Sequence, residues 1–275
     1  RVISARCTYT YSQHSAGTFS REIIRCIEVK FVMEVAQLLI SGISQGCVYG
    51  LIALGFVLIY KATEMVNFAQ GDLMMVGAFV GYGFVVLWDW PFILGVGATL
   101  AVMAVLGVVL ERLIVRPMIG EPPFAVLMLT IGLGFVLRSV AGAIWGNEPK
   151  SVPAPYAGEV VHIGTVSVGM ENIAIVLGTA VLCTLLFVFF RYSRIGIAMQ
   201  AASQNQLAAF YVGIPVKRIF ALVWGLSAVI SAVAGILVAP VSLIDPNMGF
   251  VGIKAFAAAI VGGFGSLPGA IIGGL

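Results

Sequence analysis

Side chains that could contact a small polar solute lie together in one short run of the sequence. Asn67, Gln70, Gly71 and Asp72 directly precede the apolar stretch from Leu73 to Leu87. That stretch is shorter than the ~20 residues that a helix needs to cross a ~30 Å hydrocarbon core, so the helix must include part of the polar run. Amides and a glycine at membrane depth favour a discontinuous helix whose free N–H groups attract a carboxylate. The sequence therefore predicts a substrate path at these four residues, with an ordinary helix cap at the membrane surface as the alternative.

A second segment, from Arg191 to Arg218, has the pattern of a short amphipathic helix region outside the membrane. It stops at Gly213 and Pro215, and its recurring apolar residues are Ile195, Ile197, Met199, Ala202, Leu207, Ala209, Phe210 and Val212. The chain has no Gly-rich phosphate-binding loop, so a transport process driven by ATP would need a separate ATPase. A helix inserted into a groove of that ATPase would connect the two proteins. A helix that rests on the lipid headgroups is the alternative.

Enzymatic and metal chemistry are not indicated. The apolar runs carry no paired carboxylates, no His-Glu metal signature and no Ser-His set, so we expect no catalytic residue, no metal site and no cofactor held by this chain. The cysteines show no paired or metal-ligand spacing, and they are Cys7, Cys26, Cys47 and Cys183. Two basic residues, Arg138 and Lys254, lie inside apolar runs. They either extend to the membrane surface or mark a pathway or a partner.

The elements that position these residues must be membrane-spanning helices. Hydrophobic residues make up 60% of the 275, charged residues only 10%, and the mean hydropathy is +1.08, which excludes a water-soluble globule. Backbone groups in lipid must pair within their own segment, so the long apolar runs are helices. We predict an all-α, polytopic bundle of about seven spans: Val35 to Tyr60, Leu73 to Trp88, Pro91 to Leu110, Phe124 to Trp145, Glu171 to Phe190, Phe220 to Ala239 and Val251 to Leu275. Between the fourth and fifth spans, Gly146 to Met170 is expected to form a small extended hairpin.

Two boundaries are predicted for the bundle. Residues Arg1 to Val32 are polar and aperiodic and lack the apolar core of a signal peptide, so we interpret 1–32 as a disordered extension and 33–275 as the membrane domain. The last apolar run ends at Gly273, Gly274 and Leu275 without a polar flank. This ending predicts that the natural protein continues beyond the sequence.

Basic residues predict the orientation of the spans. Arg112 and Arg116 lie in one connection, Arg191, Arg194, Lys217 and Arg218 lie in another on the same side by parity, and Lys61 agrees with both. The positive-inside rule makes that side cytoplasmic.

Small residues predict where helices touch, because lipid gives helices no hydrophobic reason to associate. Two ladders with a four-residue spacing are the candidates: Gly42, Gly46 and Gly50 in the first span, and Gly265, Gly269 and Gly273 in the last. The pair Gly77 and Gly81 is a weaker candidate for packing.

Several segments of the chain resemble a known family. The run from Leu207 to Gly213 is similar to the Glu-Ala-Ala-x-x-x-Gly coupling motif of ABC importer permeases, with Leu207 in place of glutamate and Ala208 and Ala209 as the two alanines. Gly50 to Gly81 and Gly262 to Gly269 resemble the branched-chain amino-acid permease family. So does the segment that contains Arg194, Gly196, Asn205 and Gly213.

The resemblance implies a multi-pass permease subunit of an ABC importer in the bacterial inner membrane. Its expected partners are a second permease subunit, two cytoplasmic ATPase subunits that bind ATP, a periplasmic amino-acid binding protein and the lipid bilayer, and no nucleic acid. The expected substrates are branched-chain amino acids, with urea and short-chain amides as the alternative. A secondary transporter or a channel would more naturally carry acidic residues or histidine inside its spans.

Overall fold

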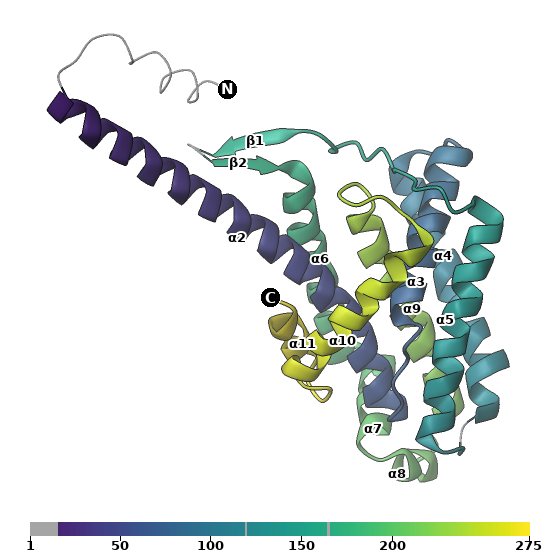
Figure 1. Cartoon of the computed structure of the whole chain (residues 1–275). Coiled ribbons are helices and arrows are strands. Elements are labelled where there is room, and N and C mark those ends of the chain that lie inside the picture. The colour runs from purple at the N-terminus through teal and green to yellow at the C-terminus, as the bar shows by residue number, and fades with distance from the viewer. Residues whose placement is uncertain (1–15, 119, 164–165) are drawn as a thin grey trace.

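The computed structural model describes residues 16–118, 120–163 and 166–275 and is almost entirely helical. Its α-helices are α2 (Ala16–Thr63), α3 (Gln70–Tyr82), α4 (Phe92–Leu110), α5 (Pro123–Trp145), α6 (Met170–Tyr192), α7 (Arg194–Gln204), α8 (Gln206–Tyr211), α9 (Val216–Val238), α10 (Val251–Gly262) and α11 (Leu267–Gly274). Single π-helical turns continue α3 through Gly83–Leu87 and α4 through Glu111–Val115. Within the described residues, six helices are long and apolar enough to cross a membrane. The predicted polytopic helical fold is confirmed (Figure 1).

The six spans lie close to their predicted positions. They are Glu34–Thr63, Gln70–Leu87, Phe92–Met118, Phe124–Trp145, Met170–Tyr192 and Val216–Val238. The second span includes Gln70, Gly71 and Asp72, as its length required. The lengths of the apolar runs, measured against the thickness of the hydrocarbon core, were sufficient to locate these helices.

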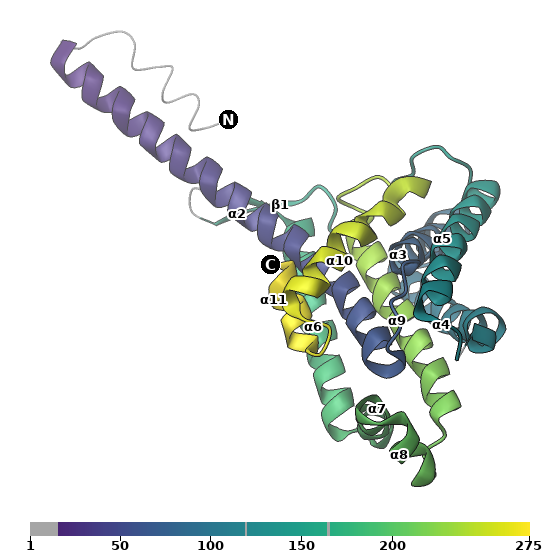
Figure 2. The same cartoon turned by 60° about the horizontal axis from the view of Figure 1, so that its bottom comes forward.

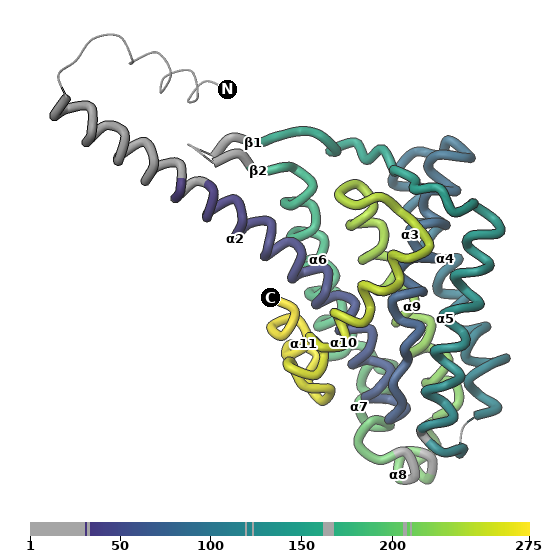
Figure 3. Tube along the Cα trace, viewed as in Figure 1, coloured from purple at the N-terminus to yellow at the C-terminus, as the bar shows by residue number. Residues whose placement is uncertain are grey.

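The predicted seventh span is wrong. The apolar run after Val251 forms two short helices, α10 and α11, that lie side by side (Figure 3). Gly263 adopts a positive φ of 82°, and the Ser266 hydroxyl accepts a hydrogen bond of 3.1 Å from the Gly269 N–H at the start of α11. The 12 residues of α10 give a helix of about 18 Å, too short to cross the hydrocarbon core.

The N-terminal boundary also differs from the expectation. Helix α2 begins at Ala16, so the part of the predicted disordered extension from Ala16 onward is helical, while residues 1–15 lie outside the described residues. The apolar spanning part of α2 begins at Glu34, one residue from the predicted boundary.

Helices α7 and α8 lie at one end of the bundle, and the hairpin of β1 (Val160–Ile163) and β2 (Val166–Gly169) lies at the other (Figures 1 and 2). Lys61 lines a small cavity together with Gln200 of α7, and Arg116 Nη2 donates a 3.1 Å hydrogen bond to the Lys217 carbonyl. The basic residues that were assigned to the cytoplasm therefore share the end that carries α7 and α8. This arrangement agrees with the predicted orientation.

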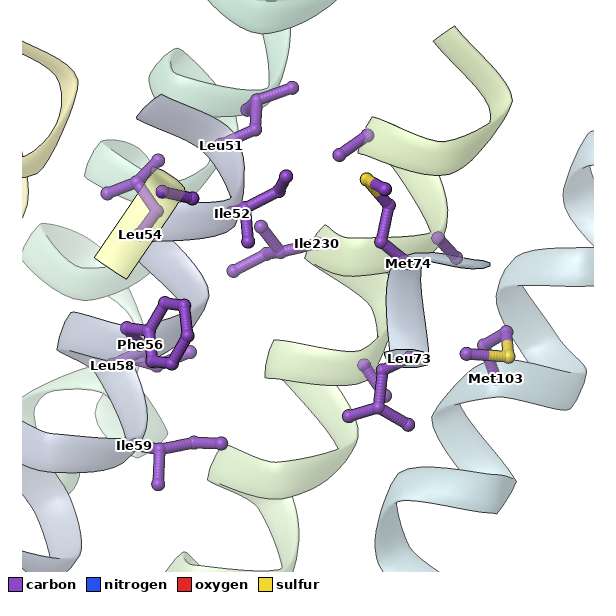
Figure 4. Close-up of a cluster of buried hydrophobic side chains, with 14 of the residues drawn as sticks. Leu51, Ile52, Leu54, Phe56, Leu58, Ile59, Leu73, Met74, Met103 and Ile230 are labelled. Carbon is purple, nitrogen blue, oxygen red and sulfur yellow. The ribbon is translucent and has the colours of Figure 1, made fainter. Parts of the chain in front are cut away.

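Helix α9 occupies the centre and packs against α2, α3 and α4. Fully buried side chains from all four helices meet there, among them Ile52, Met74, Met103 and Ile230 (Figure 4). The backbones also approach closely: a side chain at Gly77 of α3 would collide with the α9 backbone at Ala232. The weaker predicted pair, Gly77 and Gly81, is thus part of the main helix contact.

The two predicted glycine ladders pack only in part. The backbone of α11 leaves no room for a side chain at Gly46 and little room at Gly50. Gly269 and Gly273 lie in the same way against the backbone of α10, with no room for a side chain. At Gly42 and Gly265 an added Cβ would meet no described atom within 4 Å, so a packing role for these two glycines stays a prediction.

The external loops are tied together by backbone pairing. The predicted hairpin is confirmed, with Val160 opposite Gly169 and Val161 opposite Val168 in antiparallel register. Lys150 and Ile244, from two different loops, exchange hydrogen bonds of 2.9 and 2.8 Å. In the loop that contains Lys150, burial raises the pKa of the Tyr156 hydroxyl, and the nearby Glu171 carboxylate raises this pKa further.

Candidate translocation and coupling sites

The predicted polar run begins helix α3 inside the bundle rather than at its surface. Residues 64–69 form no helix, and α3 starts at Gln70. The Gln70 side chain contacts Ser227 and Ser231, which lie midway along α9. A helix that starts level with the middle of a spanning helix starts at membrane depth, as expected for a discontinuous helix.

The two amide side chains of the run form a closed polar network. Gln70 Nε2 donates to Ser231 Oγ at 2.6 Å, and Gln70 Oε1 accepts from Ser227 Oγ at 3.0 Å and from Asn67 Nδ2 at 3.4 Å. Asn67 Oδ1 also accepts from the Ala69 N–H at 3.1 Å, and Ser227 Oγ lies 3.2 Å from the Gly55 carbonyl. Asn67 and Gln70 are both fully buried. The hydrogen bonds of Gln70 fasten the start of α3 to α9, and Ser227 in turn contacts α2 at Gly55. The place of Asn67 and Gln70 on a substrate path stays a prediction.

The carboxylate of the run pairs with one of the two basic residues noted in the apolar stretches. Asp72 Oδ1 accepts a 2.9 Å hydrogen bond from Arg138 Nη2 on α5. Gly134 and Gly249 leave space for this carboxylate, since a side chain at either position would collide with it. Arg138 is therefore held by an internal counter-ion, and this outcome favours a pathway or partner role over simple extension to the membrane surface.

Gly71 allows a second helix to begin beside α3. Its Cα lies against the backbone of Gly249 and Gly252, so a side chain at Gly71 would collide with both. Gly249 belongs to the 3-10 turn Pro246–Phe250, and this turn leads directly into α10. The starts of α3 and α10 therefore touch, and the Asp72–Arg138 pair lies beside the contact.

The cytoplasmic segment forms two helices separated by Asn205. The Asn205 side chain accepts a 2.9 Å hydrogen bond from the Ala208 N–H, so Asn205 caps the start of α8. Gly213 ends the segment in a left-handed conformation with a φ of 89°. Gly196 lets α7 lie directly against the backbone of Phe189 and Phe190 at the end of α6. The predicted short helical region is confirmed as α7 and α8, and its position outside the membrane stays a prediction.

The two small residues of the coupling motif face opposite ways. Ala208 is exposed, whereas Ala209 is only 5% exposed and packs against the bundle. Arg194 is also exposed, and among the described side chains of the segment the exposed apolar residues are Tyr192, Ile195, Ile197, Tyr211 and Val212. The side chain of Leu207 lies outside the described part of the chain. The surface available to a partner thus includes Ala208 and excludes Ala209.

An ion pair at the end of α4 holds the first turn of α9, where the chain leaves the α7–α8 segment. Glu111 is 1% exposed and accepts two hydrogen bonds from Arg116, at 3.1 Å from Nε and 2.8 Å from Nη2. The same Nη2 reaches the Lys217 carbonyl in the first turn of α9. Sequence reasoning used Arg116 only for orientation and missed this contact, although the five-residue spacing of opposite charges was visible.

The structure adds partners that sequence reasoning did not find. Ser227 and Ser231 lie four residues apart on one face of α9, and this spacing in an apolar helix could have indicated a polar contact. Among the described residues no group of three or more His, Cys, Asp or Glu side chains is placed to hold a metal ion.

Comparison with known proteins gives a consistent result. The sequence profile of the family described as "Branched-chain amino acid transport system / permease component" matches residues 38–275. The chain is 30% identical over 253 residues to the high-affinity branched-chain amino acid transport system permease protein LivH of Escherichia coli K12, covering 87% of this chain and 82% of the relative.

Two further relatives extend the match. The chain is 30% identical, with the same coverage, to the high-affinity branched-chain amino acid transport system permease protein BraD of Pseudomonas aeruginosa. The probable branched-chain amino acid transport permease protein LivH of Methanocaldococcus jannaschii is 31% identical over 230 residues, covering 82% of this chain and 73% of the relative. No solved structure matches the chain significantly.

Proposed function

Because the chain belongs to the family of permease components of branched-chain amino acid transport systems, we propose that it translocates leucine, isoleucine and valine across the bacterial inner membrane. The match to residues 38–275 carries this proposal, since it includes all six apolar spans except the first residues of one. The discontinuous start of α3 supports it, because helices that begin at membrane depth are typical of solute sites in transporters.

Energy for this transport comes from partner subunits. The exposed apolar residues of α7 and of the α8–α9 turn, together with Ala208, form a surface at the cytoplasmic end that suits docking into a groove of an ATPase. The proposed complex contains a second permease, two ATPase subunits that bind the ATP, and a periplasmic binding protein that delivers the amino acid. The permease itself holds no cofactor in this scheme.

The test is uptake by the assembled complex in proteoliposomes. We expect radiolabelled leucine to enter only when the ATPase subunits, ATP and the binding protein are all present. Uptake of urea with no uptake of leucine would move the substrate to the urea and short-chain amide class. Leucine flux through the permease alone, without ATP, would instead identify a channel or secondary transporter and contradict the proposal.

A further inference from the structure

One surface of the bundle carries two cations at membrane depth. The Arg138 guanidinium on α5 lies 4.0 Å from the centre of the Phe250 ring and 5.7 Å from that of Phe135. Both rings are at least half exposed, and Lys254, one helical turn after Phe250, is exposed as well. We call these four residues the Arg138 face.

The charges distinguish this face from a lipid-facing one. An arginine or lysine at the centre of a span costs about 2.5–3.5 kcal/mol on insertion scales. Lys254 has no ion pair or hydrogen bond within the described part of the chain. On α6, by contrast, the exposed residues along the helix include Leu177, Val181 and Leu185, all of which suit lipid. The Arg138 face therefore suits contact with water more than contact with lipid.

Arg138 also has binding capacity that the chain does not use. A guanidinium presents five N–H donors and binds a carboxylate best through two parallel hydrogen bonds. Here Asp72 receives one hydrogen bond, from Nη2, while Arg138 Nε is enclosed and has no partner among the described residues. An enclosed donor without an acceptor is costly, and an incoming carboxylate would satisfy it.

We propose that the Arg138 face lines the aqueous path and that Arg138 binds the α-carboxylate of the amino acid in transit. This inference rests on the proposed function and names the part of the substrate that the permease recognises. Asp72 acts as the internal counter-ion at rest; when the substrate carboxylate takes its place on the guanidinium, Asp72 is free to attract the α-ammonium group. The Phe135 and Phe250 rings offer apolar surface to the substrate side chain.

Thiol labelling tests whether the face is wet. In a background with Cys7, Cys26, Cys47 and Cys183 replaced by serine, we compare Lys254→Cys with the matched control Val181→Cys on α6. We expect a charged methanethiosulfonate to modify the first at least ~10-fold faster, because charged reagents do not enter hydrocarbon. Leucine transport should slow the reaction. Equal rates at the two positions would overturn the path assignment.

Charge variants test the carboxylate contact in the reconstituted complex. We expect Arg138→Gln to lose at least ~10-fold of the leucine uptake, since a charge-assisted pair is lost, and Asp72→Asn to lose less, because the guanidinium remains although the α-ammonium group loses its counter-charge. Arg138→Lys should lie between these values. The double variant Asp72→Asn/Arg138→Gln separates the roles. It stays inactive if Arg138 binds substrate, whereas restored uptake would reduce the pair to a structural contact and overturn the proposal.

The remaining outcomes are also distinguishable. If the unmodified complex takes up no branched-chain amino acid, the proposed function fails, and the labelling still decides whether the face is wet. If the unmodified complex transports leucine and Arg138→Gln does so at the same rate, only the present inference fails. If the Arg138 variants do not assemble with the ATPase, the Lys254→Cys measurement, made in the serine-substituted background with Arg138 intact, decides whether the Arg138 face lines the path and whether leucine transport protects it.

Discussion

Arg116 holds Glu111 through two hydrogen bonds, of 3.1 and 2.8 Å, and at the same time binds the first turn of α9 at the Lys217 carbonyl. This single guanidinium connects the cytoplasmic end of α4 to the chain that has just left α7 and α8. A movement of the coupling segment would therefore reach α4 through Arg116.

We predict that Arg116→Gln uncouples ATP hydrolysis from uptake. The variant leaves the buried Glu111 carboxylate without its cation, and removing one partner of a buried ion pair costs about 3–5 kcal/mol. ATPase activity should persist while leucine uptake falls. Arg112→Gln is the matched control, because Arg112 is exposed in the same stretch. Equal uptake by both variants and the unmodified protein would contradict the prediction.

The opposite orientations of Ala208 and Ala209 predict two different defects. Ala208→Arg should insert normally and fail to co-purify with the ATPase, because it places a charge on the exposed side of α8. Ala209→Arg should instead destabilise the permease itself, since burying an unpaired charge costs several kcal/mol. Thermal unfolding in detergent separates the two. Ala157→Arg, in an exposed external loop, should be harmless, and equal behaviour of the two alanine variants would refute the assigned orientations.

Accessibility of the amide network should depend on the transport cycle. Asn67 and Gln70 are fully buried, so cysteines at these positions should resist a water-soluble thiol reagent in the resting complex. If they lie on the path, they become at least ~10-fold more reactive during ATP-driven uptake, because an open state exposes them. Protection in both states would assign the amides to helix packing alone.

Two glycine variants should change stability in opposite directions. Gly71→Ala forces the starts of α3 and α10 apart and should lower the unfolding free energy by about 1–3 kcal/mol, as overpacking does. Gly132→Ala adds a methyl group where no described atom lies within 4 Å and should stabilise α5 by up to about 1 kcal/mol. Denaturation monitored by tryptophan fluorescence would measure both. A Gly71→Ala variant as stable as the unmodified protein would show that the close contact is not needed.

The spans could be predicted from sequence because the bilayer fixes their length and forces their backbones into helices. The same argument failed at Val251–Leu275, since hydrophobicity does not distinguish one span from two half-helices of equal total length. The local signal was present in the sequence as glycine at 263 and proline at 268.

The sequence located the segment that holds the candidate site, but it did not identify the residues of other helices that contact this segment. The shortness of the run after Asp72 required α3 to begin at membrane depth, and it does. The partners Ser231 and Arg138 depend on which faces of α5 and α9 turn toward α3, and no local pattern contains that information. The inward position of Ala209 was missed for a related reason, because two adjacent small residues do not indicate which of them faces the bundle.

The paired backbones of Lys150 and Ile244 make the two external loops one mechanical unit. Ile244 is fully buried, and only Asp245 and the short turn after it separate this pairing from Phe250, the ring that covers the Arg138 guanidinium. Only six residues of chain therefore connect the paired loops at the outer surface to the ring beside the Asp72–Arg138 ion pair. A protein that binds the loop before β1 could therefore displace the Phe250 ring through the Lys150–Ile244 pairing, without contacting a residue in the hydrocarbon core.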